Sequence, residues 1–252
     1  MDNPVIQTML KHRSVRKFTQ QIPGDDILEA VVRAGQQAPF ASQLYSILLR
    51  RNRKCPFGAA WWFTICVDIH KMELFMEKRG WKVVSSDLAL LLLGIQDAAY
   101  AAENMVIAAE SLGLGTCFIG SAPYQSKRIR KEFKLPPRVF PLVDLVMGYP
   151  AEEFPPRPRY PLEFTLFENS YPELSGEKLE RAMKVMDDGY LSQGYYKKQK
   201  AKLPLEGGKE ETYTYDNYSW TEHISRKWGQ WWADPRELLD PLEACGFDIH
   251  RG

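Results

Sequence analysis

One long apolar stretch dominates the pattern of the chain and predicts a helix followed at once by a buried strand. Residues 88–112 contain no proline, and Gly113 with Gly115 marks a point where a helix ends in a left-handed residue. Asp87 is suited to be the N-cap. We expect a helix of roughly 25 residues, about 37 Å long, and then a strand that reaches Ser121. Apolar residues surround nearly all of this helix and alanines line one side, which favours a core or a subunit interface.

A membrane-spanning helix is the alternative for the same stretch. Asp97, Glu103, Asn104 and Glu110 interrupt the apolar run well short of the roughly 20 apolar residues that a bilayer requires. The first residues, MDNPVIQTMLKHR, also lack the layout of a signal peptide. The sequence therefore favours a core helix of a soluble protein.

Shorter segments of helical and strand-like periodicity alternate along the rest of the chain. Further helices are predicted at residues 4–10, 27–32, 72–80, 126–135, 174–189, 220–232 and 234–245. Further strands are predicted at 43–50, 60–67 and 140–148. The segment 36–42 reads as a loop, and 197–212 reads as a mobile surface loop. Interleaved helices and strands indicate an α+β or an α/β fold with a central sheet.

Composition allows one large domain, or one domain with an extension. The chain has 252 residues, of which 44% are apolar, and its net charge of +1 provides no bulk field that would favour nucleic acid or an anionic membrane. Cys66 and Cys117 lie in apolar, strand-like runs, and the four cysteines include no CxxC pair. Reduced, buried thiols are the ordinary case for such positions, so a reducing cytoplasm is expected.

Two short basic clusters are candidate anion sites. One is HRSVR at residues 12–16, and the other is Arg157 with Arg159 on a proline-rich arm that begins near Tyr149. Alternating residues of an extended segment project to one side, and two guanidinium groups on one side suit a phosphate. A solvated basic surface is the alternative for either cluster alone. Two such clusters in an otherwise neutral chain favour an anion site.

The common catalytic motifs are absent from the sequence. There is no G-x-x-x-x-G-K-[ST], no G-x-S-x-G and no H-E-x-x-H, and the Gly113-x-Gly115 pair precedes a strand, which is the wrong order for a Rossmann fingerprint. His70, His223 and His250 are isolated and are expected to be polar surface or cap residues. No metal site is predicted.

Several segments, in this order, resemble the FMN-dependent nitroreductase superfamily. They are HRSVRKF, QQAPFASQLYSILLRR, AAYAAENMVIAAESLGLGTCFIGS, PLVDLVMGYP and PPRPRYP. The chain is similar in particular to the oxygen-insensitive NAD(P)H nitroreductase and flavin reductase group, which shares a continuation like FENSY at 167–171 and a helical C-terminal extension. The similarity covers most of residues 3–175. The connection RNRKCPFG at 51–58 is shorter than its counterpart in the family.

The resemblance implies an α+β fold with a mainly antiparallel central sheet flanked by helices. It also implies a homodimer with the long helix in the dimer core and one FMN in each of two interface clefts. Residues 1–160 would form the FMN-binding core. Residues 161–252 would form a C-terminal arm and helical extension that wraps the core or the partner subunit.

The resemblance further assigns cofactor-binding residues. The N-terminal flavin contacts would be His12, Arg13, Ser14 and Arg16, and the loop that contacts the flavin across the interface would supply Ala38, Pro39, Phe40 and Gln43. The turn near the flavin ring would consist of Ile119, Gly120 and Ser121. The phosphate would be bound by Arg157 and Arg159. Arg16 would stabilise the negative charge that gathers on the reduced flavin, and Gly120 would let the backbone approach the ring. No catalytic residue is assigned, because flavin N5 carries the chemistry.

The implied function is reduction of a small-molecule acceptor by NAD(P)H through FMN, in ping-pong order. Nitroaromatics, quinones or free flavin are the expected acceptors. A relative with other flavin chemistry, such as reductive dehalogenation or flavin cleavage, and a flavin-binding protein without turnover are the alternatives. Arg226, Lys227 and Arg236 could receive the 2′-phosphate of NADPH, although isolated basic residues on terminal helices are usually solvated.

Overall fold

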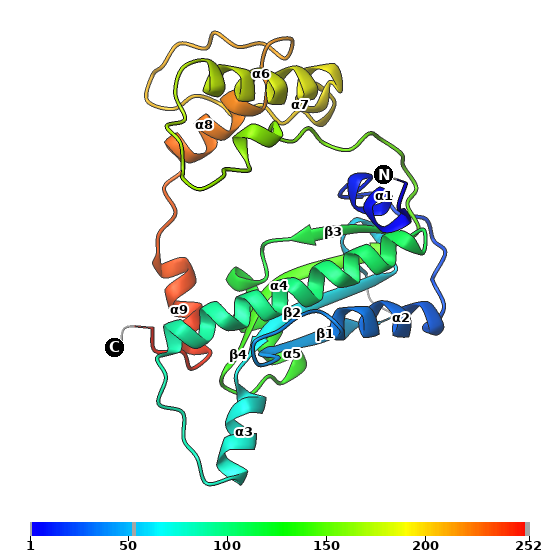
Figure 1. Cartoon of the computed structure of the whole chain (residues 1–252), viewed down its shortest axis with the longest axis vertical. Coiled ribbons are helices and arrows are strands. Elements are labelled where there is room, and N and C mark those ends of the chain that lie inside the picture. Colours follow the sequence, from blue (N-terminus) through cyan, green and yellow to red (C-terminus); the bar gives the residue numbers. More distant parts are fainter. Residues whose placement is uncertain (1, 52–53, 250–252) are drawn as a thin grey trace. The chain divides into compact units, whose positions relative to one another are not determined.

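A computed structural model describes residues 2–51 and 54–249, and the chain forms two compact units (Figure 1). Unit 1 comprises Met1–Phe154 and Pro235–Gly252, and unit 2 comprises Pro155–Asp234. Asn52 and Arg53 of the short connection, and His250, lie outside the described residues. The functional division expected between residues 160 and 161 stays a prediction.

Unit 1 is built on a four-stranded antiparallel sheet in the order β1-β2-β4-β3. The strands are β1 Tyr45–Arg50, β2 Trp61–Asp68, β3 Gly115–Ile119 and β4 Val139–Gly148. The two central strands, β2 and β4, are rich in aromatic and β-branched residues, as strands buried on both faces are. The predicted α+β class with an antiparallel sheet is confirmed.

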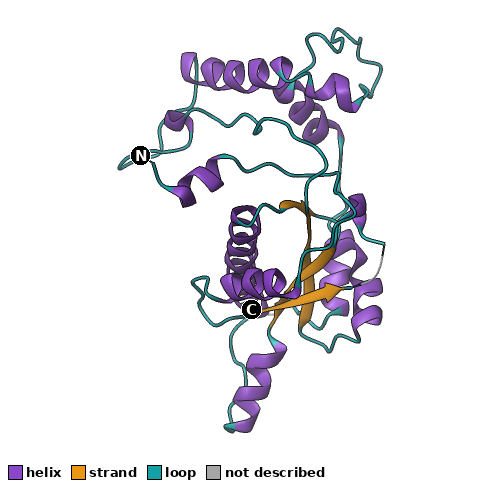
Figure 2. Cartoon of the chain, turned by 90° about the vertical axis from the view of Figure 1, so that its right-hand side faces the viewer, coloured by secondary structure: helices purple, strands orange, loops and turns teal. Residues whose placement is uncertain are grey.

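Side chains alternate between the two faces of β2, so that the sheet has one apolar and one partly polar face. Phe63 and Ile65 are fully buried in the apolar cluster formed with α2, Asp25–Gln36, and α4, Asp87–Ser111. On the other face Thr64 accepts a hydrogen bond from Arg50, which also pairs with Glu132 of α5, Ser126–Phe133. Figure 2 shows helices on both sides of the sheet.

The other helices follow the predicted segments with shifted ends. In unit 1 they are α1 Pro4–Leu10, α3 His70–Lys78 and α9 Arg236–Ala244, and in unit 2 they are α6 Glu177–Ser192, α7 Tyr195–Gln199 and α8 Trp220–Gln230. Single 3-10 turns lie at Pro56–Gly58, Pro123–Gln125 and Leu162–Phe164. The five-residue helix α7 was not predicted, because it is too short to display a helical period.

The long helix α4 spans 25 residues, as expected, and ends before Gly113, whose φ is +81°. Its N-cap is Ser86, whose hydroxyl accepts the backbone N–H of Ala89 at 3.3 Å, so the prediction of Asp87 as the cap is wrong. The Asp87 carboxylate instead accepts two hydrogen bonds from Arg138, at 2.6 and 2.8 Å. The distant arginine offers the carboxylate a charge-assisted, bidentate partner, which a cap cannot match.

One side of α4 is buried and the other is exposed and still apolar. Ala98 and Ala101 are fully buried against the sheet and α2, whereas Leu88 and Leu92 are 50% and 53% exposed. By length and composition alone the helix could span a bilayer, but half of its apolar window is buried within the fold. It therefore serves as a core helix that retains an uncovered apolar side.

In unit 2 the proline-rich arm lies against α6. A Cβ atom on Gly189 of α6 would come within 2.5 Å of Pro158, and the Gln193 side chain donates to the carbonyl of Pro156 at 2.9 Å. Only glycine permits this close approach. The arm is thus supported by the helix that follows it in the chain.

Candidate functional site

The N-terminal basic segment runs along the edge strand β3. Ser14 forms a parallel bridge with Thr116, and the N–H of Val15 donates to the Thr116 carbonyl at 2.8 Å. Val15 is buried over Gly115, where a Cβ atom would come within 2.6 Å of its side chain. A glycine at the start of β3 therefore lets the basic segment lie close to the strand.

His12 is oriented by an acidic residue at the end of α4. Its Nδ1 lies 2.8 Å from Oε1 of Glu110, and the Thr116 hydroxyl donates to the same oxygen at 2.8 Å. Glu110 is mostly buried, with a side chain that is 13% exposed. The carboxylate thus joins the basic segment, α4 and β3 in one polar network.

The two arginines of the segment differ in their surroundings. Arg13 makes a long ion pair with Glu153 at 3.7 Å, and its Nε is buried without a hydrogen-bond partner among the described residues. The exposed Arg16 side chain forms no ion pair or hydrogen bond with the part of the chain that the structure describes. Burial raises the pKa of the Cys117 thiol in β3, and the positive charge of Arg16 partly opposes this rise. The Arg16 side chain therefore places positive charge beside β3 without an ion pair in the described part of the chain, while its backbone N–H donates to the Glu152 carboxylate at 3.2 Å.

The turn predicted to approach a ring lies at the end of the same strand. β3 ends at Ile119, and apart from Gly120 and its two chain neighbours no atom of the described residues lies within 4 Å of the position that a Cβ on Gly120 would occupy. The Ser121 hydroxyl accepts a hydrogen bond from Gln125 at 3.0 Å, which holds the turn on the following 3-10 helix. The structure therefore brings residues 12–16 and 119–121 together on β3.

The loop at 38–43 is held elsewhere, by the buried carboxylate of Asp97 in the middle of α4. Asp97 accepts backbone N–H groups from Ala41 at 2.6 Å, from Ser42 at 3.1 Å and from Leu44 at 3.0 Å. Within this loop Gln43 is left-handed, with φ of +52°, so the predicted strand begins at Tyr45 rather than at residue 43.

The side chains of the loop differ in how far they are exposed to solvent. Ala38 is buried, whereas the ring of Phe40 is 52% exposed. Pro39 lies between them and is also exposed. Among the described residues no hydrogen bond joins this loop to 13–16 or 119–121 of the same chain.

Arg157 and Arg159 lie in unit 2 and have separate partners there. Arg157 donates to the Gln193 side chain at 2.6 Å, and its guanidinium carbon lies 4.3 Å from the ring centroid of Tyr195. Arg159 is exposed and donates to two backbone carbonyls of its own arm at 3.1 Å. Their role toward a phosphate stays a prediction.

A cleft of about 440 Å³ lies at the opposite end of β3, beside α1. Its lining includes Lys11, Arg13, Glu110 and residues 113–115. Arg13 is the one predicted site residue that lines it. Among the described residues no group of three acidic, histidine or cysteine side chains could hold a metal ion.

Sequence reasoning missed Asp97 and Glu110 as organising residues. Both were noted only as interruptions of the apolar run in α4. A carboxylate on an otherwise apolar, buried helix must find donors, and this signal could have identified both. Which donors it finds depends on the tertiary fold.

Comparison with known proteins identifies the family of the chain. Residues 59–149 match the model of the nitroreductase family. The chain is 30% identical over 207 residues to an oxygen-insensitive NADPH nitroreductase of Salmonella typhimurium, covering 76% of this chain and 85% of that protein. It is 29% identical over 229 residues to an FMN reductase (NADPH) of Bacillus subtilis, covering 84% and 89%.

A solved structure extends the likeness to the whole fold. The hypothetical oxidoreductase YcnD of Bacillus subtilis superposes with a TM-score of 0.83 at 25% identity, covering 99% of this chain and 100% of that one. Sequence identity, coverage and fold agree, and the chain belongs to the nitroreductase family.

Proposed function

We propose that the protein is an NAD(P)H-dependent FMN oxidoreductase that reduces small-molecule acceptors such as nitroaromatics, quinones or free flavin. The observation that carries the proposal is the basic segment 12–16 aligned on β3, next to the open turn at Gly120. Relatives named as FMN reductase (NADPH), NADPH-flavin oxidoreductase and Cr(VI) reductase support the same activity.

The residues on β3 fit a flavin in three respects. The Arg16 side chain offers positive charge without an ion pair among the described residues, Arg13 keeps a buried N–H without a partner there, and Gly120 leaves open space beside its backbone. An anionic, planar cofactor would use each of these features. His12, Ser14, Ile119 and Ser121 lie on the same strand edge or turn and are included in the proposed site.

Bound FMN would supply the redox chemistry, taking up hydride from reduced nicotinamide and passing two electrons to the acceptor. The chain's own residues bind and orient the reactants. Arg16 would stabilise negative charge, Glu110 fixes the His12 ring, and Gly120 permits close approach of a ring. Arg157 and Arg159 of the arm would bind the phosphate. Because the cofactor carries the reaction, no acid-base pair of side chains is required.

A homodimer would complete this site. The loop with Ala38, Pro39, Phe40 and Gln43 is anchored on α4, away from β3, so a second copy would supply it across the interface. The exposed apolar side of α4, with Leu88, Leu92 and Tyr100, offers a surface for that copy. The free, buried thiols of Cys66, Cys117 and Cys245 support a reducing cytoplasm as the compartment.

The visible spectrum and steady-state kinetics of the purified protein test the proposal. We expect the absorption of oxidised flavin, and NADPH oxidation that depends on a quinone or a nitroaromatic. Initial-rate plots should be parallel, because donor and acceptor would occupy the same place in turn. Bound flavin without acceptor-dependent turnover would favour a flavin-binding protein, and turnover confined to a halogenated substrate would favour dehalogenation.

A further inference from the structure

The proline-rich arm of unit 2 places Arg157 against the short turn that joins α6 to α7. Gly194 in this turn is left-handed, with φ of +59°, a conformation that glycine adopts without steric cost. Gln193 precedes this glycine and Tyr195 follows it, and both side chains contact Arg157. The turn therefore directs two side chains from different helices onto one arginine.

Gln193 holds the arm at two consecutive residues. Its side-chain oxygen accepts a hydrogen bond from the Arg157 guanidinium at 2.6 Å, and its side-chain NH₂ group donates to the carbonyl of Pro156 at 2.9 Å. An amide carries an acceptor and two donors on one group, so it can satisfy both partners. A carboxylate could not donate to the carbonyl, and an apolar side chain could do neither. The two hydrogen bonds fix the guanidinium relative to the backbone of the arm.

Tyr195 supports the face of the same guanidinium. The guanidinium carbon of Arg157 lies 4.3 Å from the ring centroid, within the roughly 6 Å of a cation–π contact. The ring of Tyr195 packs edge-on against Tyr190 and Tyr196, at centroid distances of 5.4 and 5.0 Å, and Tyr196 is buried. Because the ring is backed by a buried neighbour and the guanidinium is planar, the two contacts restrict the orientation of Arg157.

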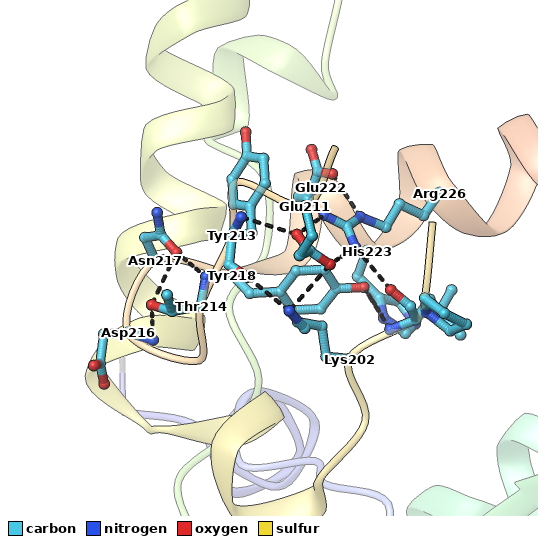
Figure 3. A network of polar contacts seen from close by, with 12 residues as sticks. Lys202, Glu211, Tyr213, Thr214, Asp216, Asn217, Tyr218, Glu222, His223 and Arg226 are labelled. Atoms are coloured by element: carbon cyan, nitrogen blue, oxygen red, sulfur yellow. Dashed lines mark hydrogen bonds and ion pairs between the residues drawn. The ribbon is translucent and has the colours of Figure 1, made fainter. Parts of the chain in front are cut away.

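These two contacts orient Arg157 without compensating its charge, because an amide and a phenol ring are neutral. Arg226, a buried arginine of the same unit, has the opposite surroundings (Figure 3). Its side chain is 2% exposed and donates to both carboxylate oxygens of Glu211, at 2.7 and 2.8 Å, and to Glu222 at 2.6 Å. Two carboxylates compensate the charge of Arg226, which suits a structural tie. Orientation by neutral groups suits an arginine that binds an anion.

We propose that Gln193 and Tyr195 are positioning residues for the FMN phosphate and act by orienting Arg157. This inference rests on the proposed function, in which Arg157 binds that phosphate. The two residues would not touch the cofactor. They would reduce the side-chain entropy lost on binding, because the guanidinium is ordered before the phosphate arrives. Arg159, which is exposed and donates to carbonyls of its own arm, would adapt to the phosphate while Arg157 is held in place.

Fluorescence titration of the full-length protein freed of flavin tests the proposal, with FMN and riboflavin compared for every variant. Tyr195→Leu removes the ring and should weaken FMN binding about three- to tenfold, as expected for the loss of one cation–π contact. Gln193→Leu should weaken FMN binding by a similar factor. Riboflavin lacks the phosphate, so its affinity should stay almost unchanged. Tyr195→Phe keeps the ring and should bind FMN as the wild type does.

A double-mutant cycle separates positioning from a structural role. If Tyr195 acts through Arg157, Tyr195→Leu should have almost no further effect on FMN binding in the Arg157→Ala protein. Gln193→Leu should behave in the same way. Gln193→Glu replaces the neutral acceptor with a carboxylate that still accepts from Arg157 but compensates its charge. This variant should therefore weaken the binding of FMN and not that of riboflavin.

Gln199→Leu and Tyr215→Leu are the matched controls, because they make the same changes at exposed residues of unit 2. They should leave the affinities for both flavins unchanged. Equal losses for FMN and riboflavin, or losses that persist undiminished in the Arg157→Ala protein, would overturn the proposal. So would an FMN affinity that none of the variants of Gln193 and Tyr195 lowers. Circular dichroism checks folding, and Gln193→Glu, which changes few atoms, carries the comparison if a leucine variant misfolds.

Failure of this inference and failure of the proposed function are distinguishable. A wild-type protein that binds neither flavin contradicts the proposed function. An Arg157→Ala protein with unchanged FMN affinity contradicts the phosphate role of Arg157, and the positioning role falls with it. If Arg157→Ala weakens FMN binding and the variants of Gln193 and Tyr195 do not, only the positioning role is contradicted.

Discussion

Asp97 accepts the backbone N–H of Leu44 at 3.0 Å, and both residues are 1% exposed. The same carboxylate accepts two further N–H groups from the loop that precedes Leu44. A carboxylate in the centre of the core helix thus determines the course of a loop that is more than 50 residues away in sequence. Because this loop is proposed to reach the flavin of a partner subunit, we expect its anchoring to affect both stability and cofactor binding.

Asp97→Asn should destabilise the fold by about 2–4 kcal/mol. The amide keeps one acceptor oxygen but directs its NH₂ group at a backbone N–H that the carboxylate had satisfied. Urea unfolding measures the effect. Glu103→Gln on the exposed side of the same helix is the control and should change the free energy of unfolding by less than about 0.5 kcal/mol. Equal changes for the two variants would contradict the anchoring role.

The exposed apolar side of α4 should mediate dimerisation, with a total buried area above roughly 2,000 Å². Leu92→Lys places a charge on that side and should shift the light-scattering mass toward the monomer value of 29.1 kDa. Ile22→Lys, at an apolar residue outside α4 that is 70% exposed, should leave the dimer intact. A wild-type protein that is monomeric with FMN bound would rule out the two-chain site.

Arg159→Ala should weaken FMN binding about ten- to a hundredfold and leave riboflavin binding almost unchanged. A charge-assisted hydrogen bond to phosphate contributes about 1.5–3 kcal/mol, and riboflavin lacks the phosphate. Fluorescence titration of both flavins gives the comparison. Arg181→Ala, an exposed arginine of the same unit paired with Glu163, is the control. Equal losses for the two flavins would show that the arm acts through folding rather than through charge.

Arg16→Ala should lower the midpoint potential of the bound flavin by roughly 30–65 mV. The lost charge would stabilise the reduced flavin more than the oxidised one, by about 1.5–3 kcal/mol, and for two electrons 30 mV corresponds to about 1.4 kcal/mol. Spectroelectrochemical titration measures the potential, with Lys17→Ala as the neighbouring control. An unchanged potential with stoichiometric FMN would limit Arg16 to a structural role.

The ion pair between Asp87 and Arg138 should make stability depend on pH in the acid range. Hydrogen bonds from Arg138 are the main cause that lowers the pKa of Asp87 in the folded protein. The stabilisation is therefore complete above the unfolded-state pKa of about 4 and is lost as the pH falls through the lower, folded-state value. In urea unfolding, Asp87→Asn should be less stable than the wild type at neutral pH. The difference should shrink at about pH 3, and a constant difference would contradict the linkage.

The helices and strands that a local pattern of residues defines could be predicted from the sequence. The length of α4 and its stop at Gly113 follow from a period and a backbone preference within the helix itself. The choice between Ser86 and Asp87 as the N-cap does not follow from local patterning, because both residue types are good caps. The hydrogen bonds from Arg138 to Asp87 decide between them. The left-handed conformation of Gln43 likewise depends on a residue distant in sequence, because Asp97 of α4 binds the backbone N–H groups on both sides of Gln43.

The proposed site likewise has some features that the sequence predicts and others that depend on the tertiary fold. The basic segment 12–16 was visible because its charges are adjacent in sequence, and its position on β3 is consistent with that reading. Arg226, Lys227 and Arg236 had equal standing as candidates in the sequence, which could not show that Glu211 and Glu222 pair with Arg226. Burial and pairing, which separate these three residues, exist only once the chain has folded.

The chain leaves unit 1 at Phe154 and returns to it at Pro235, where α9 packs back beside the core with Phe247 on the ring of Phe140. The described part of unit 2 is therefore a continuous insert between two segments that belong to one core. An insert of this kind can lengthen, shorten or change its chemistry in evolution without a new strand order in the sheet. The insert could then diverge among homologues while the site proposed on β3 is inherited unchanged.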